Sequence, residues 1–235
     1  MTEITTPKTV TLATYNIHAC IGSDGKFDPA RIAAVINEID ADIIALQEVE
    51  HHSVEEQDLL EYLAYQTGHE ALAGPTLFRE SRHYGNALLS RLPLKSFKQI
   101  DLSVAGFEPR AAIEATFDAA GYELQVIATH LGLKSAERRW QVKKLLELKS
   151  LQEADISCLL GDVNEWLLWG RPLRWLHRHF TAQPHLATFP ARWPLFALDR
   201  IWIAPKRCQI DLFVHKSSLA RQASDHLPLV SRIQL

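Results

Sequence analysis

The feature that most constrains this chain is a repeated pattern, in which a short apolar segment leads into a polar side chain that could bind a metal ion or transfer a proton. The segments are 10–17, 43–46, 122–129 and 156–160. The polar residues at their ends are Asn16, Glu48, His130 and Asp162. Runs of this length, with alternating or continuous apolar character, predict β-strands. Because loops at the ends of strands in a rigid scaffold often build a functional site, the pattern predicts one site assembled from several strand ends.

Helical signals lie between these strands. Asp28-Pro29 predicts an N-cap followed by the first helical residue. The sequence from Ser53 to Glu56 has the capping-box pattern, which predicts a helix that ends at Gly68. Further helices are expected over about 135–151 and 172–180. Strands with helices in both halves, around a strand-rich middle, predict two sheets covered by helices.

Composition favours one globular domain. The chain has 235 residues, of which 47% are hydrophobic, and it has no linker-like tract, so we expect a domain over 10–235 after a polar tail at 1–9. The net charge of −3 means that any contact with nucleic acid must come from a local patch. Cys20, Cys158 and Cys208 are dispersed, which predicts reduced thiols. With no signal-like or membrane-spanning run, a cytoplasmic location is expected.

The polar residues at the strand ends form a set suited to metal-assisted hydrolysis. Six segments supply Asn16, Glu48, His130, Asp162 with Asn164, Asp199, and Asp225 with His226. Carboxylate and amide oxygens are hard ligands that favour Mg²⁺ or Mn²⁺ over Zn²⁺. Two histidines beside such a cation are what hydrolysis of a phosphoester would need, because one donates to a phosphoryl oxygen and the other takes a proton from water.

Seven short strings in this sequence resemble, in order, the motifs of the endonuclease/exonuclease/phosphatase superfamily. They are Thr14-Tyr15-Asn16-Ile17-His18, Leu46-Gln47-Glu48-Val49, Tyr84-Gly85-Asn86-Ala87-Leu88-Leu89-Ser90, Thr129-His130-Leu131, Gly161-Asp162-Val163-Asn164, Leu198-Asp199-Arg200-Ile201 and Ser224-Asp225-His226-Leu227-Pro228. The resemblance covers nearly the whole chain, from about Thr11 to Val230. It implies a DNase I-like α/β fold, a four-layer α-β-β-α sandwich.

The resemblance also implies a role for each matching residue. The metal ligands would be Asn16, Glu48 and Asp225. The catalytic residues would be His130, Asp162, Asn164, Asp199 and His226. Asp162 would orient or deprotonate the attacking water, and Asp199 would orient the ring of His226. Arg110 and Asn86 would contact the substrate. One departure is His18, which stands where abasic-site nucleases of the superfamily usually have an aspartate.

Other interpretations stay open for some of these residues. A lone Asn16 is also what ends a strand at a turn, and Asp162 with Asn164 is also a helix-cap pattern. His18 with Cys20 could suggest zinc, although no further spaced ligands accompany them. The triplet Ser224-Asp225-His226 cannot be a hydrolase triad, because neighbours on an extended chain point to opposite faces.

The segment 166–180 is unusually rich in tryptophan, leucine and arginine. Leu173, Leu176 and Phe180 fall on one helical stripe, and a second stripe carries Arg171, Arg174 and Arg178. One interpretation is a surface helix packed by its leucines. The other is a wall for an anionic substrate close to Asp162, to which Arg174 and Trp169 contribute binding contacts.

The sequence therefore predicts a hydrolase that uses Mg²⁺, with Mn²⁺ as a substitute, to cleave a phosphodiester by in-line attack of water. A phospholipid or other headgroup diester is the preferred substrate class. The alternatives are a DNA or RNA nuclease of the same superfamily and, from another class, a catalytically silent binding module. No obligate protein partner is expected.

Overall fold

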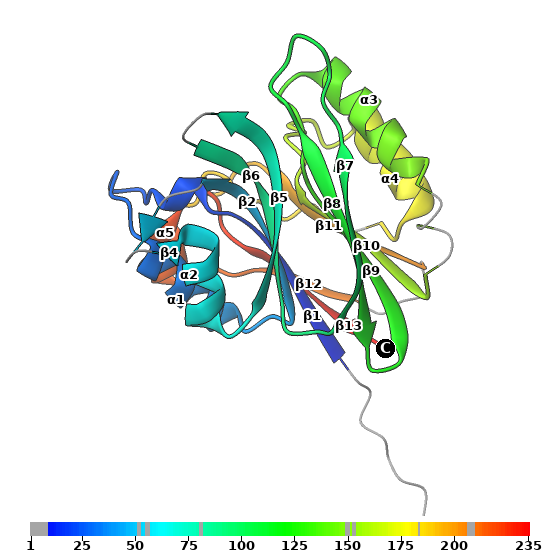
Figure 1. The fold of residues 1–235 in the computed structure, drawn as a ribbon. Coiled ribbons are helices and arrows are strands. Elements are labelled where there is room, and N and C mark those ends of the chain that lie inside the picture. The colour runs from blue at the N-terminus through cyan, green and yellow to red at the C-terminus, as the bar shows by residue number, and fades with distance from the viewer. Residues whose placement is uncertain are drawn as a thin grey trace, which may run out of the picture.

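The computed structural model describes residues 9–50, 53–54, 57–79, 82–148, 151, 154–182, 184–205 and 210–235. Figure 1 shows two β-sheets packed face to face, with helices on both outer sides. The expected four-layer α-β-β-α sandwich is therefore confirmed. Residues 1–8, His51, His52, Glu55, Glu56 and Cys208 lie outside the described residues.

The first sheet has six strands. Their order across the sheet is β12 (Ile210–Val214), β13 (Leu229–Gln234), β1 (Thr9–Asn16), β2 (Ile43–Glu50), β6 (Arg82–Ser90) and β5 (Glu70–Arg79). Only β1 and β2 are parallel, with Leu12 opposite Ile43. Their carboxyl ends, which carry Asn16 and Glu48, therefore meet at the same edge of the sheet.

The second sheet has five strands. Their order is β11 (Asp199–Ala204), β10 (Ile156–Asp162), β9 (Tyr122–His130), β8 (Ala111–Ala119) and β7 (Leu94–Asp101). Its parallel pair is β9 and β10, and the last residues of this pair, His130 and Asp162, are register partners. Asp199 pairs with Asp162 from the antiparallel strand β11. Three site residues are thus aligned at one strand end by backbone pairing alone. A short ribbon of β3 (Ser53–Val54) and β4 (Gln57–Asp58) stands apart.

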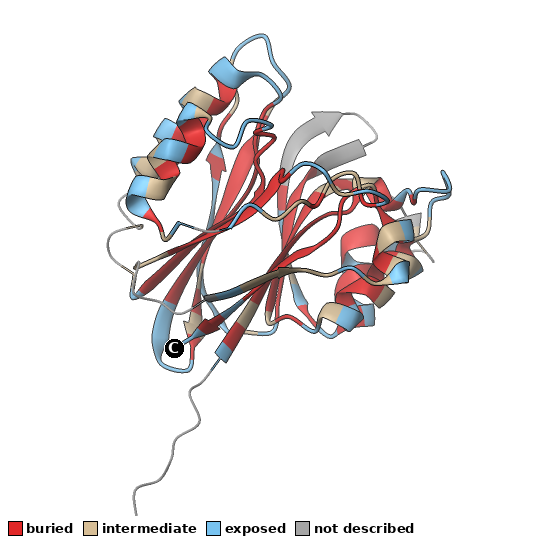
Figure 2. Ribbon diagram, turned by 180° about the vertical axis from the view of Figure 1, so that it is seen from behind, coloured by how far each residue is buried: buried red, intermediate tan, exposed pale blue. Residues whose placement is uncertain are grey.

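Helices cover the outer face of each sheet. The helices are α1 (Pro29–Ile39), α2 (Leu59–Thr67) and α5 (Ser218–Ala223) on the first sheet, and α3 (Ser135–Leu146) and α4 (Arg171–His179) on the second. Figure 2 shows burial running through both sheets, while the helices are buried on the sheet side and exposed outward. Between the sheets lies a core that includes Leu12, Leu88, Ile113 and Val126.

Helix ends follow local capping chemistry, with two corrections to the expectations. Asp28 caps α1 as predicted, because its side chain accepts from the Arg31 amide. The expected start of the second helix at Ser53 is wrong: Ser53 lies in β3, and Asp58 caps α2 instead. Gly68 ends that helix in the left-handed conformation, as expected. Helix α3 ends at Leu146, earlier than predicted.

Two observations concern the expected class of protein. Cys20 and Cys158 are both buried, and no disulfide joins them to each other. Among the described helices, none has both the length and the apolar character needed to cross a bilayer.

Candidate active site

One carboxylate oxygen, Oδ2 of Asp162, is the point on which both sheets converge. The amide Nδ2 of Asn16 donates to it across the sandwich at 3.2 Å. The Nε2 atoms of His130 and His226 lie 3.6 Å and 3.8 Å from the same oxygen. Asp162 and both histidines are almost fully buried. The structure therefore gathers into one buried cluster four side chains that are distant in the sequence.

The backbone at the end of β10 fixes the position of Asp162. Gly161 has a φ of +146°, and a Cβ at this position would stand 1.8 Å from the carbonyl oxygen of Thr129. Only glycine allows β9 and β10 to approach this closely. Beyond the strand, the amide of Asn164 donates to Oδ1 of Asp162 at 2.9 Å, with Asn164 itself at a φ of +50°. Oδ2 of Asp162 therefore faces Asn16, His130 and His226.

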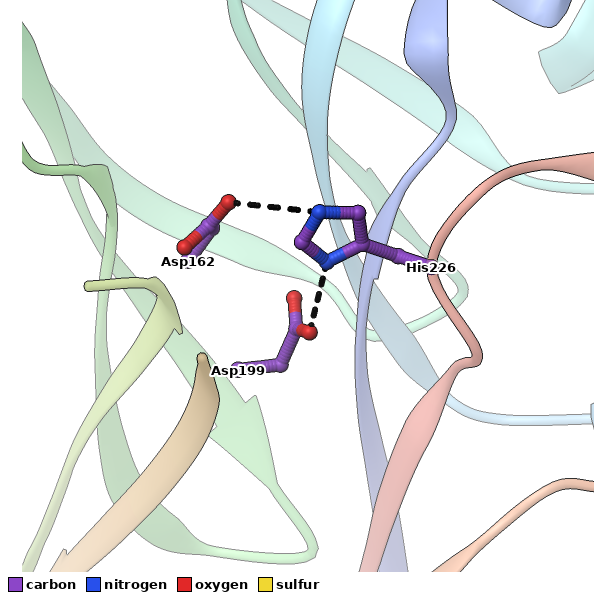
Figure 3. A group of neighbouring side chains, drawn as sticks. All are labelled: Asp162, Asp199 and His226. Atoms are coloured by element: carbon purple, nitrogen blue, oxygen red, sulfur yellow. Dashed lines mark hydrogen bonds and ion pairs between the residues drawn. The ribbon is translucent and has the colours of Figure 1, made fainter. Parts of the chain in front are cut away.

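His226 is held by Asp199, and Asp199 is held by Thr188. Nδ1 of His226 lies 2.8 Å from Oδ2 of Asp199, and the hydroxyl of Thr188 donates to the same oxygen at 2.5 Å. Figure 3 shows His226 between the carboxylates of Asp162 and Asp199. Burial acts to lower the pKa of His226, but Asp199, with Asp162 and Asp225, outweighs burial and raises the pKa to about 10. The ring therefore carries a proton on each nitrogen at neutral pH.

His130 has the opposite protonation state. Burial lowers the pKa of His130 to about 3, and the positive charge of Arg110 acts in the same direction, against the pull of Asp162. Nδ2 of Asn164 lies 3.0 Å from Nε2 of His130 and donates to the carbonyl of Leu131 at 2.9 Å. A neutral ring that accepts from the Asn164 amide fits both observations. Two histidines that face one carboxylate thus offer a neutral and a charged imidazole.

Glu48 is turned toward Asn16 by a bulge in β2. The register between β2 and β6 shifts between Leu46 and Val49, and Glu48 has a φ of +58°. Its Oε1 accepts from Nδ2 of Asn16 at 2.9 Å. Burial raises the pKa of Glu48, the charges of Asp225 and Asp162 raise it further, and the Asn16 bond opposes them. The strained backbone serves to bring a carboxylate into an already acidic environment.

The loop that carries Asp225 and His226 is tied to the end of β1. The hydroxyl of Ser224 donates to the carbonyl of Asn16 at 2.7 Å. Asp225 is partly exposed, and one of its carboxylate oxygens lies 3.9 Å from Nδ1 of His18. His18 opens a tight turn in which it and the next two residues all have positive φ values. The amide of His18 donates to Oδ1 of Asn16 at 3.0 Å, so Asn16 presents its nitrogen to the carboxylates.

The donor set fits a hard divalent cation at Glu48. The charges of Asp225 and Asp162 act on the carboxylate of Glu48, and this repulsion is what a cation would relieve. Asn16 would have to turn its amide to become a ligand. A second group, Asp162, Asp199 and His226, offers ligand atoms within 4.8 Å of one another. Since Asp199 already accepts from His226 and Thr188, this second group is better explained as a hydrogen-bonded relay.

The predicted substrate contacts divide into an inner and an outer pair. Arg110 is buried next to His130 and pairs with Glu108 at 3.1 Å, while its Nε has no partner among the described residues. Asn86 donates to the carbonyl of Ala111 at 2.8 Å, so it holds the chain directly after Arg110. Trp169 and Arg174 are exposed, and no contact of theirs with the cluster around Asp162 is seen within the described ranges.

Sequence reasoning missed Thr188 and a buried ion pair. Thr188 lies in an irregular segment with no periodic pattern. Its hydroxyl donates to the predicted carboxylate of Asp199, and such a bond orients a carboxylate. Arg138 of α3 reaches Glu165 at 3.3 Å and the carbonyl of Leu133 at 2.7 Å, and both charged side chains are buried. This pair joins α3 to the loop after Asn164. Arginine on a helix is usually exposed, so the sequence does not indicate that Arg138 is buried.

Fold and site together define the class of protein: a two-sheet sandwich whose strand ends carry carboxylates, amides and two histidines is typical of hydrolases that act on phosphoester bonds. The sequence profile of the Endonuclease/Exonuclease/phosphatase family matches residues 13–226. The chain belongs to this family, as the seven strings indicated.

Individual relatives support the same fold. YbhP of Escherichia coli (strain K12), named only as an uncharacterized protein, is 29% identical over 242 residues, which cover 94% of this chain and 95% of YbhP. An endonuclease/exonuclease/phosphatase structure from Beutenbergia cavernae is 23% identical, covers 97% of this chain and 72% of its own, and has a TM-score of 0.77. A functionally unknown conserved protein from Enterococcus faecalis has a TM-score of 0.78 at 20% identity, over 95% of this chain and 99% of its own.

Proposed function

We propose that the protein hydrolyses a phosphodiester with the help of a divalent cation, Mg²⁺ or Mn²⁺. One observation carries the proposal: Asn16, His130 and His226 all face the same oxygen of Asp162. A carboxylate that orients water, surrounded by donors for a phosphoryl group, is an arrangement suited to in-line displacement at phosphorus.

The cation would be held mainly by Glu48, with Asp225 and a turned Asn16 beside it. When bound, it would supply positive charge that polarises a phosphoryl oxygen and stabilises the transition state. The raised pKa of Glu48, caused first by burial and then by neighbouring carboxylates, supports this assignment. A cation would keep this carboxylate ionised.

The remaining steps belong to the protein's own side chains. Asp162 would orient the attacking water and take its proton. His226 would donate from Nε2 to a phosphoryl oxygen, while Asp199 holds the ring through Nδ1. Arg110, with a buried Nε that lacks a partner among the described residues, would bind the charge that develops on the phosphoryl group. Asn164 would contact the same group, giving up its bond to His130.

A phospholipid or other headgroup diester is the substrate class that we favour. The segment after Asn164 exposes Trp166, Leu167, Leu168 and Trp169 close to the cluster, and apolar side chains suit a substrate with an apolar part. Nucleic acid is the alternative within the family. A silent binding module is the alternative from another class, and it is opposed by the fact that each position implied by the resemblance carries a chemically competent residue.

The test is an activity screen with and without the cation. Purified protein should hydrolyse bis(p-nitrophenyl) phosphate, and then one of abasic DNA, single-stranded DNA or RNA, inositol phosphates, sphingomyelin or glycerophospholipids. A chelator should abolish the rate, and Mg²⁺ or Mn²⁺ should restore it. Glu48→Gln should weaken Mg²⁺ binding measured by calorimetry, whereas the exposed Glu61→Gln on α2 should not. Restoration by Zn²⁺ alone, or unchanged cation affinity in Glu48→Gln, would contradict the proposal.

A further inference from the structure

Two loops beside the catalytic cluster expose a group of large apolar side chains, which we call the apolar rim. Its members are Leu167, Leu168, Trp169, Trp193 and Leu195. Trp169, Trp193 and Leu195 are 71%, 72% and 73% exposed. A single exposed apolar residue needs no explanation, but five on two adjoining loops indicate a surface that contacts something apolar.

Aromatic contacts join the two loops to each other and to the catalytic histidine. The ring of Trp166 lies 4.7 Å from that of Phe196 and 5.9 Å from that of Phe189, measured between centroids. The ring of Phe189 lies 4.8 Å from that of His226. A continuous series of rings therefore leads from the protonated imidazole outward to the loops of the rim.

The loop that carries Trp193 and Leu195 is held in place by backbone bonds. Phe189 and Phe196 form a bridge at its base, and the guanidinium of Arg221 on α5 donates to the carbonyls of Ala191 and Arg192 at 3.2 Å and 3.1 Å. The amide of Ala191 donates to the carbonyl of Asp225. A loop fixed at its base and near its tip presents its exposed side chains in one orientation, which lowers the entropy cost of binding.

The charge around the rim is opposite to that of the whole protein. Between Val163 and Leu198 the sequence has four arginines and one acidic residue, a formal 4 − 1 = +3, in a chain of net charge −3. Arg171 follows Trp169 closely, and Arg192 directly precedes Trp193. Both arginines are exposed, and neither is paired with a carboxylate in the part of the chain that the structure describes. The acidic residue, Glu165, is buried against Arg138.

We propose that the apolar rim docks on the surface of an anionic phospholipid bilayer, with its tryptophans and leucines among the headgroups and Arg171 and Arg192 on the lipid phosphates. Tryptophan and leucine on one side, with arginine beside them, are typical of segments that lie in a membrane interface. The leucines argue against nucleic acid, because an aliphatic side chain does not stack on a base. The inference rests on the proposed function only for its link to catalysis: docking would bring a lipid headgroup diester to His226.

The test is binding to vesicles, measured by co-sedimentation and by tryptophan fluorescence. The wild-type protein should bind vesicles of phosphatidylglycerol mixed with phosphatidylcholine, and bind pure phosphatidylcholine more weakly. Trp193→Ser combined with Leu195→Ser should weaken binding to the anionic vesicles at least about tenfold, because two exposed apolar side chains that would enter the bilayer are lost. Arg192→Glu should remove the preference for the anionic lipid. The control Tyr65→Ser, at a residue 80% exposed on α2, should bind like the wild type.

Several results would overturn this inference. Absence of wild-type binding to anionic vesicles would do so, as would a double variant that binds like the wild type. Affinity for single-stranded DNA that depends on Trp193 and falls steeply with salt, without vesicle binding, would assign the rim to nucleic acid. A wild-type dimer that the double variant converts to a monomer would assign it to a second copy of the chain. If the rim binds vesicles but no phosphodiester is cleaved, the proposed function fails and the docking surface stands.

Discussion

Asp199 and Trp193 are close together in the sequence, yet they belong to regions built in opposite ways. The cluster around Asp162 is buried, and its polar groups are bonded mainly to one another, as in the series Thr188, Asp199, His226. The apolar rim is exposed, and the neighbouring Arg171 and Arg192 have no carboxylate partner among the described residues. A change in the cluster should therefore reach several groups at once and lower kcat, whereas a change near the rim should alter only the contact with a ligand.

The largest effect is expected from Asp162→Asn. The amide keeps the shape of the side chain but cannot take a proton from water, so kcat should fall about a thousandfold. The measurement is the steady-state rate on bis(p-nitrophenyl) phosphate, with thermal unfolding as a control for the fold. A variant that keeps more than about a tenth of the wild-type rate would show that Asp162 is not the residue that activates water.

A smaller loss is expected from the pair His226 and Asp199. His226→Ala should cost about 10²- to 10³-fold in kcat, and Asp199→Asn somewhat less, because Asp199 acts only through the ring. The double variant should be no worse than His226→Ala, since members of one unit are not additive. Rates measured for all four proteins in the cycle test this. Additive losses would mean that the 2.8 Å contact has no role in the reaction.

Thr188→Val should have a moderate effect of about tenfold on kcat. Valine fills the same space but removes the hydroxyl, which leaves Oδ2 of Asp199 with His226 alone. A hydrogen bond to a charged group contributes about 1.5–3 kcal/mol, and the lower end of that range corresponds to roughly a tenfold change in rate. The conservative variant Thr188→Ser, which keeps the hydroxyl, should restore most of the activity. Equal rates for the valine and serine variants would contradict the role of Thr188 in holding Asp199.

The smallest effect is expected from Arg174→Glu, outside the cluster. KM should rise about three- to tenfold while kcat stays nearly unchanged, which is the signature of binding energy expressed equally in the ground and transition states. Arg232→Glu, on β13, reverses the same charge and provides the matched control. If KM is unchanged for every substrate that is cleaved, α4 is a packed surface helix without a role in binding.

The sequence predicted the parts of the fold in which burial leaves a periodic pattern. Strands β1, β9 and β10 are buried along most of their length, and α4 buries Leu173 and Leu176 as its apolar stripe predicted. Strand β7 was not predicted, because seven of its eight residues are exposed and leave no alternation to detect. The start of α2 was misplaced because Ser53 and Asp58 both have capping chemistry, and only the tertiary fold selects between them.

The sequence indicated which polar residues would come together, but not how they are connected. Asn16, Glu48, His130, Asp162 and His226 stand at strand ends, where the residue type itself is informative. The bulge at Glu48, the orientation of the Asn16 amide and the bond from Thr188 to Asp199 depend on contacts between distant segments. Protonation could not be predicted from residue type either: burial lowers the pKa of His130, whereas at His226 the carboxylate of Asp199 on the second ring nitrogen helps to raise the pKa in spite of burial.

The bond between Asn16 and Asp162 crosses from one sheet to the other and joins residues 146 positions apart. Neither sheet alone supplies the complete set of groups for the proposed reaction, since Glu48 lies in the first sheet and His130 and Asp162 lie in the second, while His226 stands in the loop that leads into β13 of the first. Under the proposed function, catalytic competence would therefore be an all-or-none property of the docked sandwich. During refolding, activity should return with the docking of the sheets, after secondary structure has formed, and a chain with only one sheet folded should be silent toward phosphodiesters. Turnover of a phosphodiester would then report on the completeness of the tertiary fold.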